Sequence, residues 1–368
     1  MGIVWFIVIL GGIVLVHEFG HFIFSKIFGV YVYEFSIGMG PKIFHFKRKN
    51  KETEYCIRLI PIGGFVSLAG EDADDNKKIP ENRKLYSKPV WQRLLIMVAG
   101  VMNNFIFAFL LLFIMAFIYG SVDTTPLIGD VTEGYPAYTA GLKKGDTILK
   151  IDNNKVSNFS EIQLYLQTSE GKEMQFTVLG VDGKERVIKI TPDKVETDDG
   201  KENYVIGVSL DSTILNEGLK SILSSKKGIF KKLSLSSKQI LPSLSYAGKT
   251  TISLYKTMFL TIKQLFTGRA SVKDLSGPVG IYTIVSSEAK EGLQNILYLT
   301  AYLSINVGFI NLLPFPAFDG GRVVFLIIEK IRKKRAPVKV EAIVNGVGFI
   351  LLLLLMAFVT FNDILRII

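Results

Sequence analysis

Four stretches of the chain are mainly apolar and contain no charged residue. They cover residues 3–16, 94–119, 292–318 and 342–362, and the first continues as apolar sequence to Phe24 after a short polar interruption. A helix of about 20 residues crosses a hydrocarbon core of about 30 Å. The pattern therefore predicts an α-helical membrane protein with four transmembrane helices.

The first apolar stretch has an alternative interpretation as a cleaved signal peptide. Such a peptide has a basic segment before its apolar segment and a small-residue cleavage site after it. In this chain the first basic residue is Lys26, and nothing like Ala-x-Ala follows the apolar stretch. We therefore expect residues 3–24 to remain as a transmembrane helix.

Basic residues gather in two of the connections between these stretches. "KIRKKR" at 330–335 lies in one, and the segment 26–93 carries many Lys and Arg. Because short cytoplasmic loops are rich in Lys and Arg, loops 26–93 and 330–340 are predicted to be cytoplasmic. Both termini and residues 120–291 then lie outside. The net charge of +10 reflects this topology and attraction to the lipid bilayer; no basic face with interleaved aromatic residues indicates nucleic-acid binding.

The polar interruption in the first stretch reads HEFGH. His17 and His21 are four residues apart, so a helix places them one turn apart on the same face. With Glu18 they form His-Glu-x-x-His, in which two imidazoles bind zinc and the glutamate acts as general base on a water. The alternative is a polar bundle interior without metal. We favour zinc because the chain has only three histidines and ionisable residues inside a spanning helix are costly.

A catalytic zinc usually has three protein ligands, so a third is expected from another span at a similar depth. Asp319 is the first acid after a long uncharged run, in "INLLPFPAFDGGRVVF". Pro314 and Pro316 interrupt helical hydrogen bonding there, and broken backbone at membrane depth is tolerated where it lines a cavity or is buried in protein. Alternatively, Asp319 marks the end of the span and pairs with Arg322.

These two motifs together resemble those of the site-2 proteases, which are intramembrane zinc metalloproteases. HEFGH matches the family's zinc helix, which implies His17 and His21 as ligands and Glu18 as the catalytic base. "NLLPFPAFDGG" matches the family's Asn-x-x-Pro-x-Pro-x-x-Asp-Gly signature. That match implies Asp319 as the third ligand and Asn311 as a substrate-binding residue.

The resemblance covers nearly the whole chain and is closest to the bacterial regulators of anti-sigma-factor cleavage. "AGVMNN" (99–104) and "SGPVGI" (276–281) resemble two further family segments. The family implies a Zn²⁺-dependent enzyme of the bacterial cytoplasmic membrane that cuts peptide bonds in or near transmembrane segments. Its expected substrates are single-pass membrane proteins already shortened by another protease, such as anti-sigma factors, and remnant signal peptides.

The segment between the first two stretches has three runs typical of short strands. They cover residues 30–38, 42–49 and 52–60 and are rich in β-branched and aromatic residues. An exposed strand edge could hold an extended substrate by main-chain pairing, and the resemblance implies a cytoplasmic membrane-associated β-structure of this kind. We take Gly63 and Gly64, in the apolar segment that follows, as candidate substrate-binding residues. An ordinary cytoplasmic sheet is the alternative.

The composition becomes soluble in residues 121–211. Strand-like runs, a turn with "AGLKKGD" and a helix "NFSEIQLYLQ" capped by Asn158 or Ser160 resemble one extracytoplasmic PDZ-like α/β domain, a module that binds chain ends or extended peptides. A spacer with an unused groove is the alternative. Residues 212–290 are predicted to be a linker and an amphipathic juxtamembrane helix. The flanking membrane segments are then 1–120 and 291–368.

We therefore predict a four-span zinc metalloendopeptidase. A catalytically silent scaffold that uses its PDZ-like domain for binding is the main alternative, but such a protein needs to lose only one catalytic residue and here all four are present. A zinc or proton transporter would require ligands that reach both faces of the membrane. The ionisable residues of the spans instead cluster at one depth.

Overall fold

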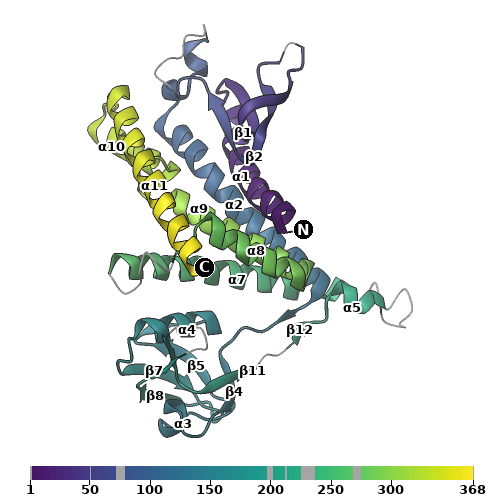
Figure 1. Ribbon diagram of the computed structural model, residues 1–368, viewed down its shortest axis with the longest axis vertical. Helices are drawn as coiled ribbons and strands as arrows, with labels where there is room; N and C mark the ends of the chain where they lie inside the picture. Colours follow the sequence, from purple (N-terminus) through teal and green to yellow (C-terminus); the bar gives the residue numbers. More distant parts are fainter. Residues whose placement is uncertain are drawn as a thin grey trace. The chain divides into compact units, whose positions relative to one another are not determined.

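The computed structural model describes residues 2–49, 51–71, 79–196, 202–211, 214–224, 237–267 and 275–367. The chain divides into two compact units (Figure 1). The first unit comprises Met1–Leu112 and Val272–Ile368, and the second comprises Phe113–Ser271.

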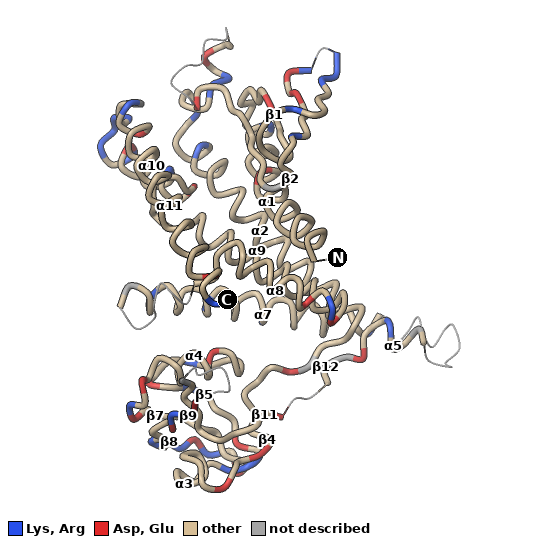
Figure 2. The backbone as a smooth tube through the Cα atoms, viewed as in Figure 1, with Lys and Arg blue, Asp and Glu red and all other residues tan. Residues whose placement is uncertain are grey.

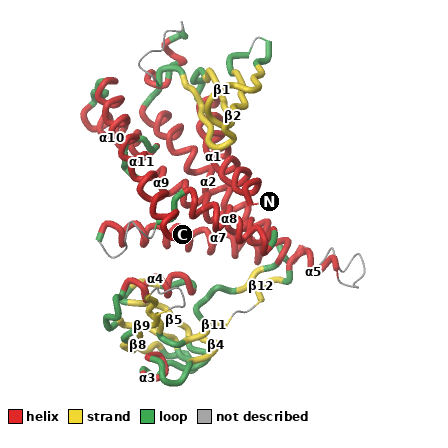
Figure 3. Tube along the Cα trace, in the orientation of Figure 1, coloured by secondary structure: helices red, strands yellow, loops and turns green. Residues whose placement is uncertain are grey.

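Within the described residues, four helices are long and apolar enough to cross a membrane (Figure 3). They are α1 (Gly2–Ile27), α2 (Val90–Tyr119), α9 (Leu293–Leu312) and, over Lys339–Arg366, α11 (Val338–Ile367). Each apolar stretch of the sequence therefore contains one such helix, as predicted.

The helix α1 packs along one side of the first unit through an apolar stripe. Residues three or four apart share a face of a helix, and Phe6, Ile9 and Ile13 form such a stripe. They are buried against α8 (Pro278–Glu291) and α9, through Val285, Ile296, Leu299 and Leu303. On another side, Gly20 lies directly against the backbone of Ala99 in α2, where any Cβ would collide. The absence of a side chain at Gly20 lets the backbones of α1 and α2 touch.

The third apolar helix ends before the charge-free stretch does. α9 stops at Leu312, residues 313–318 are irregular, and α10 (Asp319–Arg332) begins at the acid. The backbone of Ala317 has φ of 76°, a left-handed conformation that costs a non-glycine residue about 1–2 kcal/mol. Its N–H donates to Oδ1 of Asn345 in α11 at 3.4 Å. The break predicted from the two prolines is thus confirmed, and α11 helps to hold it.

A long hairpin replaces the three short strands that the sequence predicted. β1 (Val32–Phe46) pairs antiparallel with β2 (Glu54–Leu68). Gly38 and Gly40 have φ of 84° and 87° and lie where the register shifts, so the expected turn is an irregularity inside β1. Residues 34–37 have partners in both 54–57 and 64–67. The number of strands was wrong because glycine allowed the strand to bend instead of ending.

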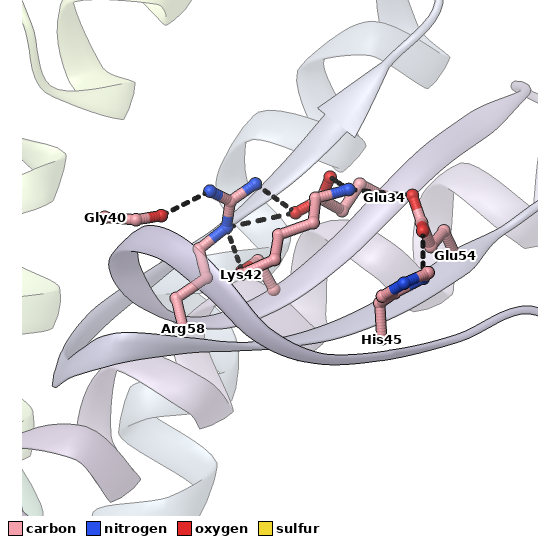
Figure 4. A network of polar contacts seen from close by, with 7 residues as sticks. Glu34, Gly40, Lys42, His45, Glu54 and Arg58 are labelled. Atoms are coloured by element: carbon pink, nitrogen blue, oxygen red, sulfur yellow. Dashed lines mark hydrogen bonds and ion pairs between the residues drawn. The ribbon is translucent and has the colours of Figure 1, made fainter.

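A network of charged side chains ties β1 to β2 (Figure 4). Glu34 pairs with Lys42 at 2.8 Å and with Arg58 at 2.6 Å, while Glu54 pairs with Lys42 at 2.8 Å and with His45 at 2.9 Å. Burial raises the pKa of Glu34, but hydrogen bonds from Lys42 and Arg58 outweigh burial and hold the pKa below its ordinary value of 4.5. Opposite charges are therefore balanced within the hairpin.

The start of the hairpin shares a core with α2 and α10. Two short helices, η1 (Glu81–Arg83) and η2 (Leu85–Ser87), precede α2. The buried side chains of this core are Val30, Val32, Leu68, Leu85, Ile96, Met97 and Leu326. Arg93 of α2, which is only 6% exposed, also pairs with Glu329 of α10. The helix that begins with Asp319 is thus fixed to α2 by both packing and charge.

The second unit contains a six-stranded sheet. Its strand order is β11-β4-β5-β7-β8, with β6 pairing with β5. The strands are β4 (Leu127–Val131), β5 (Thr147–Ile151), β6 (Asn154–Lys155), β7 (Met174–Leu179), β8 (Glu185–Ile190) and β11 (Val208–Asp211). A separate pair is formed by β9 (Asp193–Glu196) and β10 (Glu202–Val205).

Two helices belong to the same domain, α3 (Pro136–Thr139) and α4 (Phe159–Thr168). Ile162 and Leu166 of α4 are buried in the core of the sheet. Asn158 is the N-cap of α4, and its side chain accepts a hydrogen bond from the backbone N–H of Glu161 at 3.0 Å. Of the two caps that the sequence allowed, the structure therefore selects Asn158.

The rest of the second unit includes a strand pair, a short helix and a long helix outside the sheet domain. β3 (Ser121–Val122) pairs antiparallel with β12 (Ile214–Asn216), and α5 (Gly218–Ser224) follows. The predicted amphipathic segment forms α7 (Ile240–Phe266), which packs against α4 through Ser253 and Lys256. Part of the predicted linker, residues 225–236, lies outside the described residues.

Candidate metal centre

The helix α1 brings two imidazoles together, one turn apart. His17 and His21 are 6% and 8% exposed, and their Nε2 atoms are 3.3 Å apart. Nδ1 of His21 is 2.8 Å from the carbonyl oxygen of Ile96 in α2. Because a carbonyl oxygen can only accept a hydrogen bond, His21 carries its proton on Nδ1. A neutral His21 therefore presents a lone pair on Nε2 to its neighbours.

Asp319 completes the cluster from the first residue of α10. Its Oδ2 atom is 3.0 Å from Nε2 of His17 and 3.2 Å from Nε2 of His21. The alternative pairing with Arg322 is not seen, since the guanidinium of Arg322 pairs with Glu71 at the end of the hairpin. A Cβ on Gly320 would collide with the carbonyl groups of residues 312 and 313. The glycine that follows Asp319 therefore lets α10 begin hard against the end of α9.

The three ligand atoms fit a zinc ion. Atoms about 2.0–2.1 Å from a tetrahedral zinc are about 3.3–3.4 Å apart, close to the 3.0, 3.2 and 3.3 Å found here. Oδ2 of Asp319 is buried and has no hydrogen-bond donor among the described residues. Three electron-rich atoms would repel one another without a cation, so the donor set favours a metal that binds nitrogen and oxygen.

The helix α2 lies directly against the two imidazoles. A Cβ on Gly100 would be 2.5 Å from Nε2 of His21 and 2.8 Å from Cε1 of His17. Four residues along α2, the amide of Asn104 reaches Nδ1 of His17 at 3.3 Å. Both residues fall in the "AGVMNN" segment. The sequence singled out this segment, but gave Gly100 and Asn104 no role because neither residue is charged.

Glu18 and the glycines of β2 lie beside this cluster. A Cβ on Gly64 would be 3.6 Å from Cγ of Glu18 and 2.8 Å from the carbonyl oxygen of Ser36. The carboxylate of Glu18 also interacts electrostatically with the three metal-ligand candidates. The other predicted strand residue, Gly63, has φ of 92° and faces the side chain of Met39. The structure thus brings Gly64, but not Gly63, against the predicted base.

Two other sites are less closely connected to the cluster. Asn311 is half-buried, one residue before α9 ends. Glu34, Glu54 and Cys56 have ligand atoms close enough to hold a metal. Lys42 and Arg58, however, pair with the two carboxylates, so cations of the protein already compensate that charge. We do not assign a metal to this second group.

Comparison with known proteins identifies the family of the chain. Residues 5–355 match peptidase family M50. The chain is 32% identical to the "Regulator of sigma-W protease RasP" of Bacillus subtilis, over 99% of this chain and 98% of that protein. It is also 32% identical to the "Zinc metalloprotease RasP" of Bacillus licheniformis, over 99% of each. The chain therefore belongs to peptidase family M50, the site-2 proteases, and is an intramembrane zinc metalloprotease.

Proposed function

We propose that this enzyme cuts single-pass membrane proteins in or near their transmembrane segments, with zinc held by His17, His21 and Asp319. The observation that carries the assignment is the buried triangle of ligand atoms, in which Oδ2 of Asp319 has no hydrogen-bond donor in the described part of the chain. Zinc, when bound, supplies a Lewis acid that polarises a carbonyl and makes water more acidic. The residues of the chain supply the ligands, the base and the surface for the substrate.

Glu18 is the general base in this proposal. Glu18 follows His17 in the turn of α1 that separates the two histidines, and its Cγ would lie 3.6 Å from a Cβ on Gly64. Its carboxylate is therefore placed to take a proton from water beside a peptide bond that lies along β2. A positioned base of this kind contributes about 10²–10⁴-fold to a rate.

The edge of the hairpin is the proposed site for an extended substrate. Residues 64–68 of β2 pair with 32–37 of β1 on one side, and no third strand joins this sheet in the described part of the chain. The open edge offers main-chain groups without selecting strongly for side chains. Gly64 brings the backbone of β2 next to Glu18. Gly63, which precedes it in β2, and Asn311 of α9 are the other proposed substrate contacts.

The distribution of basic residues supports a proposal for which side of the membrane each loop faces. Figure 2 shows Lys and Arg of the first unit mainly at one end, on the hairpin, before α2 and between α10 and α11. By the positive-inside rule we propose that loops 26–93 and 330–340 face the cytoplasm of a bacterial cell. The two termini and residues 121–211 then lie outside the cytoplasmic membrane.

We propose that residues 121–211 form a PDZ-like domain that selects shortened substrates. In this domain β11 is an edge strand of the sheet, and such an edge can pair with an extended peptide. The name of the Bacillus subtilis relative refers to regulation of sigma-W. By analogy, anti-sigma factors already cut by another protease, and remnant signal peptides, are the substrates we propose here.

Capture of trapped substrates tests the proteolytic assignment. The Glu18→Gln form should retain about one zinc per chain and hold membrane peptides that it no longer cuts. Affinity purification followed by mass spectrometry should then find single-pass fragments that the active enzyme does not retain. Equal recovery of the same peptides with both forms, or cleavage of a model substrate by Glu18→Gln at the original rate, would refute the role of Glu18.

Replacement of residues 126–211 by a short Gly-Ser linker tests selection by the PDZ-like domain. The pairing of β3 with β12 lies outside the replaced segment. If the domain excludes bulky substrates, the shortened enzyme should cut full-length substrate faster and pre-shortened substrate as before. If the domain recruits new chain ends, only the pre-shortened substrate should be cut more slowly. An unchanged ratio of the two rates would remove both roles.

A further inference from the structure

The amide of Asn104 is buried beside His17 with one atom unsatisfied. Asn104 is 0% exposed, and its Nδ2 lies 3.3 Å from Nδ1 of His17. Its Oδ1 has no hydrogen-bond partner among the described residues. A buried amide oxygen without a donor costs about 1–3 kcal/mol, so this side chain requires an explanation.

The explanation lies in which ring nitrogen of His17 carries the proton. If Nδ2 donates to Nδ1, the neutral imidazole must carry its own proton on Nε2, which then cannot bind a metal. A half-turn of the amide exchanges Oδ1 and Nδ2 at almost the same positions. Nδ1–H of His17 then donates a hydrogen bond to Oδ1, and Nε2 is left with a free lone pair. This one rotation gives Oδ1 a hydrogen-bond donor and leaves Nε2 of His17 free to bind a metal.

The backbone around Asn104 is fixed by the third helix of the cluster. Ser304 of α9 is 0% exposed, and its hydroxyl donates to the carbonyl oxygen of Asn104 at 3.0 Å. A Cβ on Gly308, one turn further along α9, would lie 3.2 Å from Cβ of Asn104. Asn104 is therefore held between α1 and α9, and its amide has little freedom except rotation.

The two histidines differ in the kind of partner they have. His21 faces a backbone carbonyl of Ile96, which can only accept and so fixes one tautomer. His17 faces a side-chain amide, which can accept or donate. Partners that orient ligating histidines typically change metal affinity by 10–100-fold when they are removed.

We propose that Asn104 is the positioning residue of His17: its Oδ1 accepts a hydrogen bond from Nδ1–H, which holds the proton on Nδ1 and keeps Nε2 available for the metal. This inference rests on the proposed zinc site, but it concerns a residue outside the ligand set. It gives the "AGVMNN" segment of α2 a chemical role. The same contact explains why an uncharged polar residue is kept in the interior of an apolar helix.

Zinc affinity of the full chain in detergent tests the proposal, measured by competition with a chelator. Asn104→Leu removes the acceptor and should weaken zinc binding by about 10–100-fold. Asn104→Asp keeps an acceptor oxygen and should bind zinc within about threefold of the unmodified chain. With Co²⁺ in place of zinc, the visible absorption bands should change in the leucine variant and persist in the aspartate variant. Asn104→Ala asks the same question if leucine prevents folding.

Asn103→Leu is the matched control. Asn103 donates from Nδ2 to the carbonyl oxygen of Val16 in α1 at 3.2 Å, so this change removes a neighbouring α1–α2 hydrogen bond without touching an imidazole. Equal loss of zinc in Asn103→Leu and Asn104→Leu, equal loss in Asn104→Asp and Asn104→Leu, or unchanged affinity in Asn104→Leu would overturn the proposal. His17→Ala is measured in parallel: if it retains full zinc affinity, the metal site itself has been misassigned.

Discussion

Asp319 in the first unit and Glu161 in the second are both carboxylates packed inside the protein, but their surroundings differ. Glu161 is 0% exposed and accepts from the backbone N–H of Ser157 at 3.0 Å, the hydroxyl of Ser253 at 3.2 Å and Nζ of Lys256 at 2.7 Å. Asp319 faces two imidazole nitrogens, and its Oδ2 lacks a hydrogen-bond donor among the residues that the structure describes. The hydrogen bonds of Glu161 fix structure, whereas the unsatisfied oxygen of Asp319 requires an explanation, which a metal ion held with the two imidazoles would provide.

The largest expected effect is at Asp319. Asp319→Asn replaces an anionic ligand with a neutral amide, so zinc affinity should fall by more than the roughly 100-fold upper range for a residue that only orients a ligand. Cleavage should fall to background. Metal analysis of the purified chain and a peptide-release assay measure both quantities, with Glu18→Gln as the control that loses cleavage but keeps zinc. Full zinc content in Asp319→Asn would place the third ligand elsewhere.

The next largest effect is expected at Gly100, where α2 lies against the two imidazoles. Gly100→Ala places a Cβ 2.5 Å from Nε2 of His21, and relief of such overpacking costs about 1–3 kcal/mol. Zinc affinity should therefore fall by roughly 5–150-fold. Gly12→Ala is the control on α1, because nothing lies within 4 Å of a Cβ there. If both variants bind zinc equally well, the contact between α2 and the imidazoles does not limit the site.

A change at Glu161 should act on structure and leave the metal unaffected. Glu161→Gln removes a charged acceptor, which costs about 1–3 kcal/mol, so backbone amides at the start of α4 should exchange hydrogen roughly 5–150-fold faster. Zinc content should not change. Glu170→Gln is the control for loss of an exposed carboxylate, since Glu170 is exposed and forms an ion pair with Lys172 at the protein surface. Loss of zinc in the Glu161 variant would show that the two carboxylates are not independent.

The smallest effect is expected for Glu34 in the hairpin. Its pKa is lower in the folded chain than the ordinary 4.5, so its stabilising contribution is complete above pH 4.5 and is lost as pH falls through the lower folded value. The loss should be within about 1 kcal/mol, as for other ion pairs near a surface. Hydrogen exchange of residues 32–46, corrected for its intrinsic pH dependence, should show it. The same pH dependence in Glu34→Gln would assign the effect to another group.

The sequence predicted the metal cluster better than its surroundings. Spacing alone placed His17 and His21 on one face, and an acid after a long uncharged run identified Asp319. Nothing comparable marked Asn104, because an uncharged polar residue in an apolar helix has several ordinary explanations. Its importance depends on which faces of α1, α2 and α9 meet, and hydropathy does not specify that rotation.

The fold shows the same division between local and long-range information. The positions of the four long apolar helices depend on nearby residues and were predicted, and Asn158 was one of the two caps predicted for α4. The hairpin was predicted as three strands because Gly38 and Gly40 are usual turn residues, yet here they bend β1 without ending it. The contact between Glu161 and Lys256 joins residues distant in the chain, so no local pattern could indicate it.

The pairing of β3 with β12 has a consequence for the evolution of this protein family. The chain enters and leaves the domain between these strands through two neighbouring segments, so the stretch of gene that encodes residues 126–211 forms a cassette. Its duplication, exchange or loss leaves both flanking strands able to pair. The alignment with the Bacillus subtilis relative extends over 441 residues although this chain has 368, so the length of the enzyme has changed between relatives. A cassette bounded by paired strands provides a place where such a change need not disturb the membrane helices.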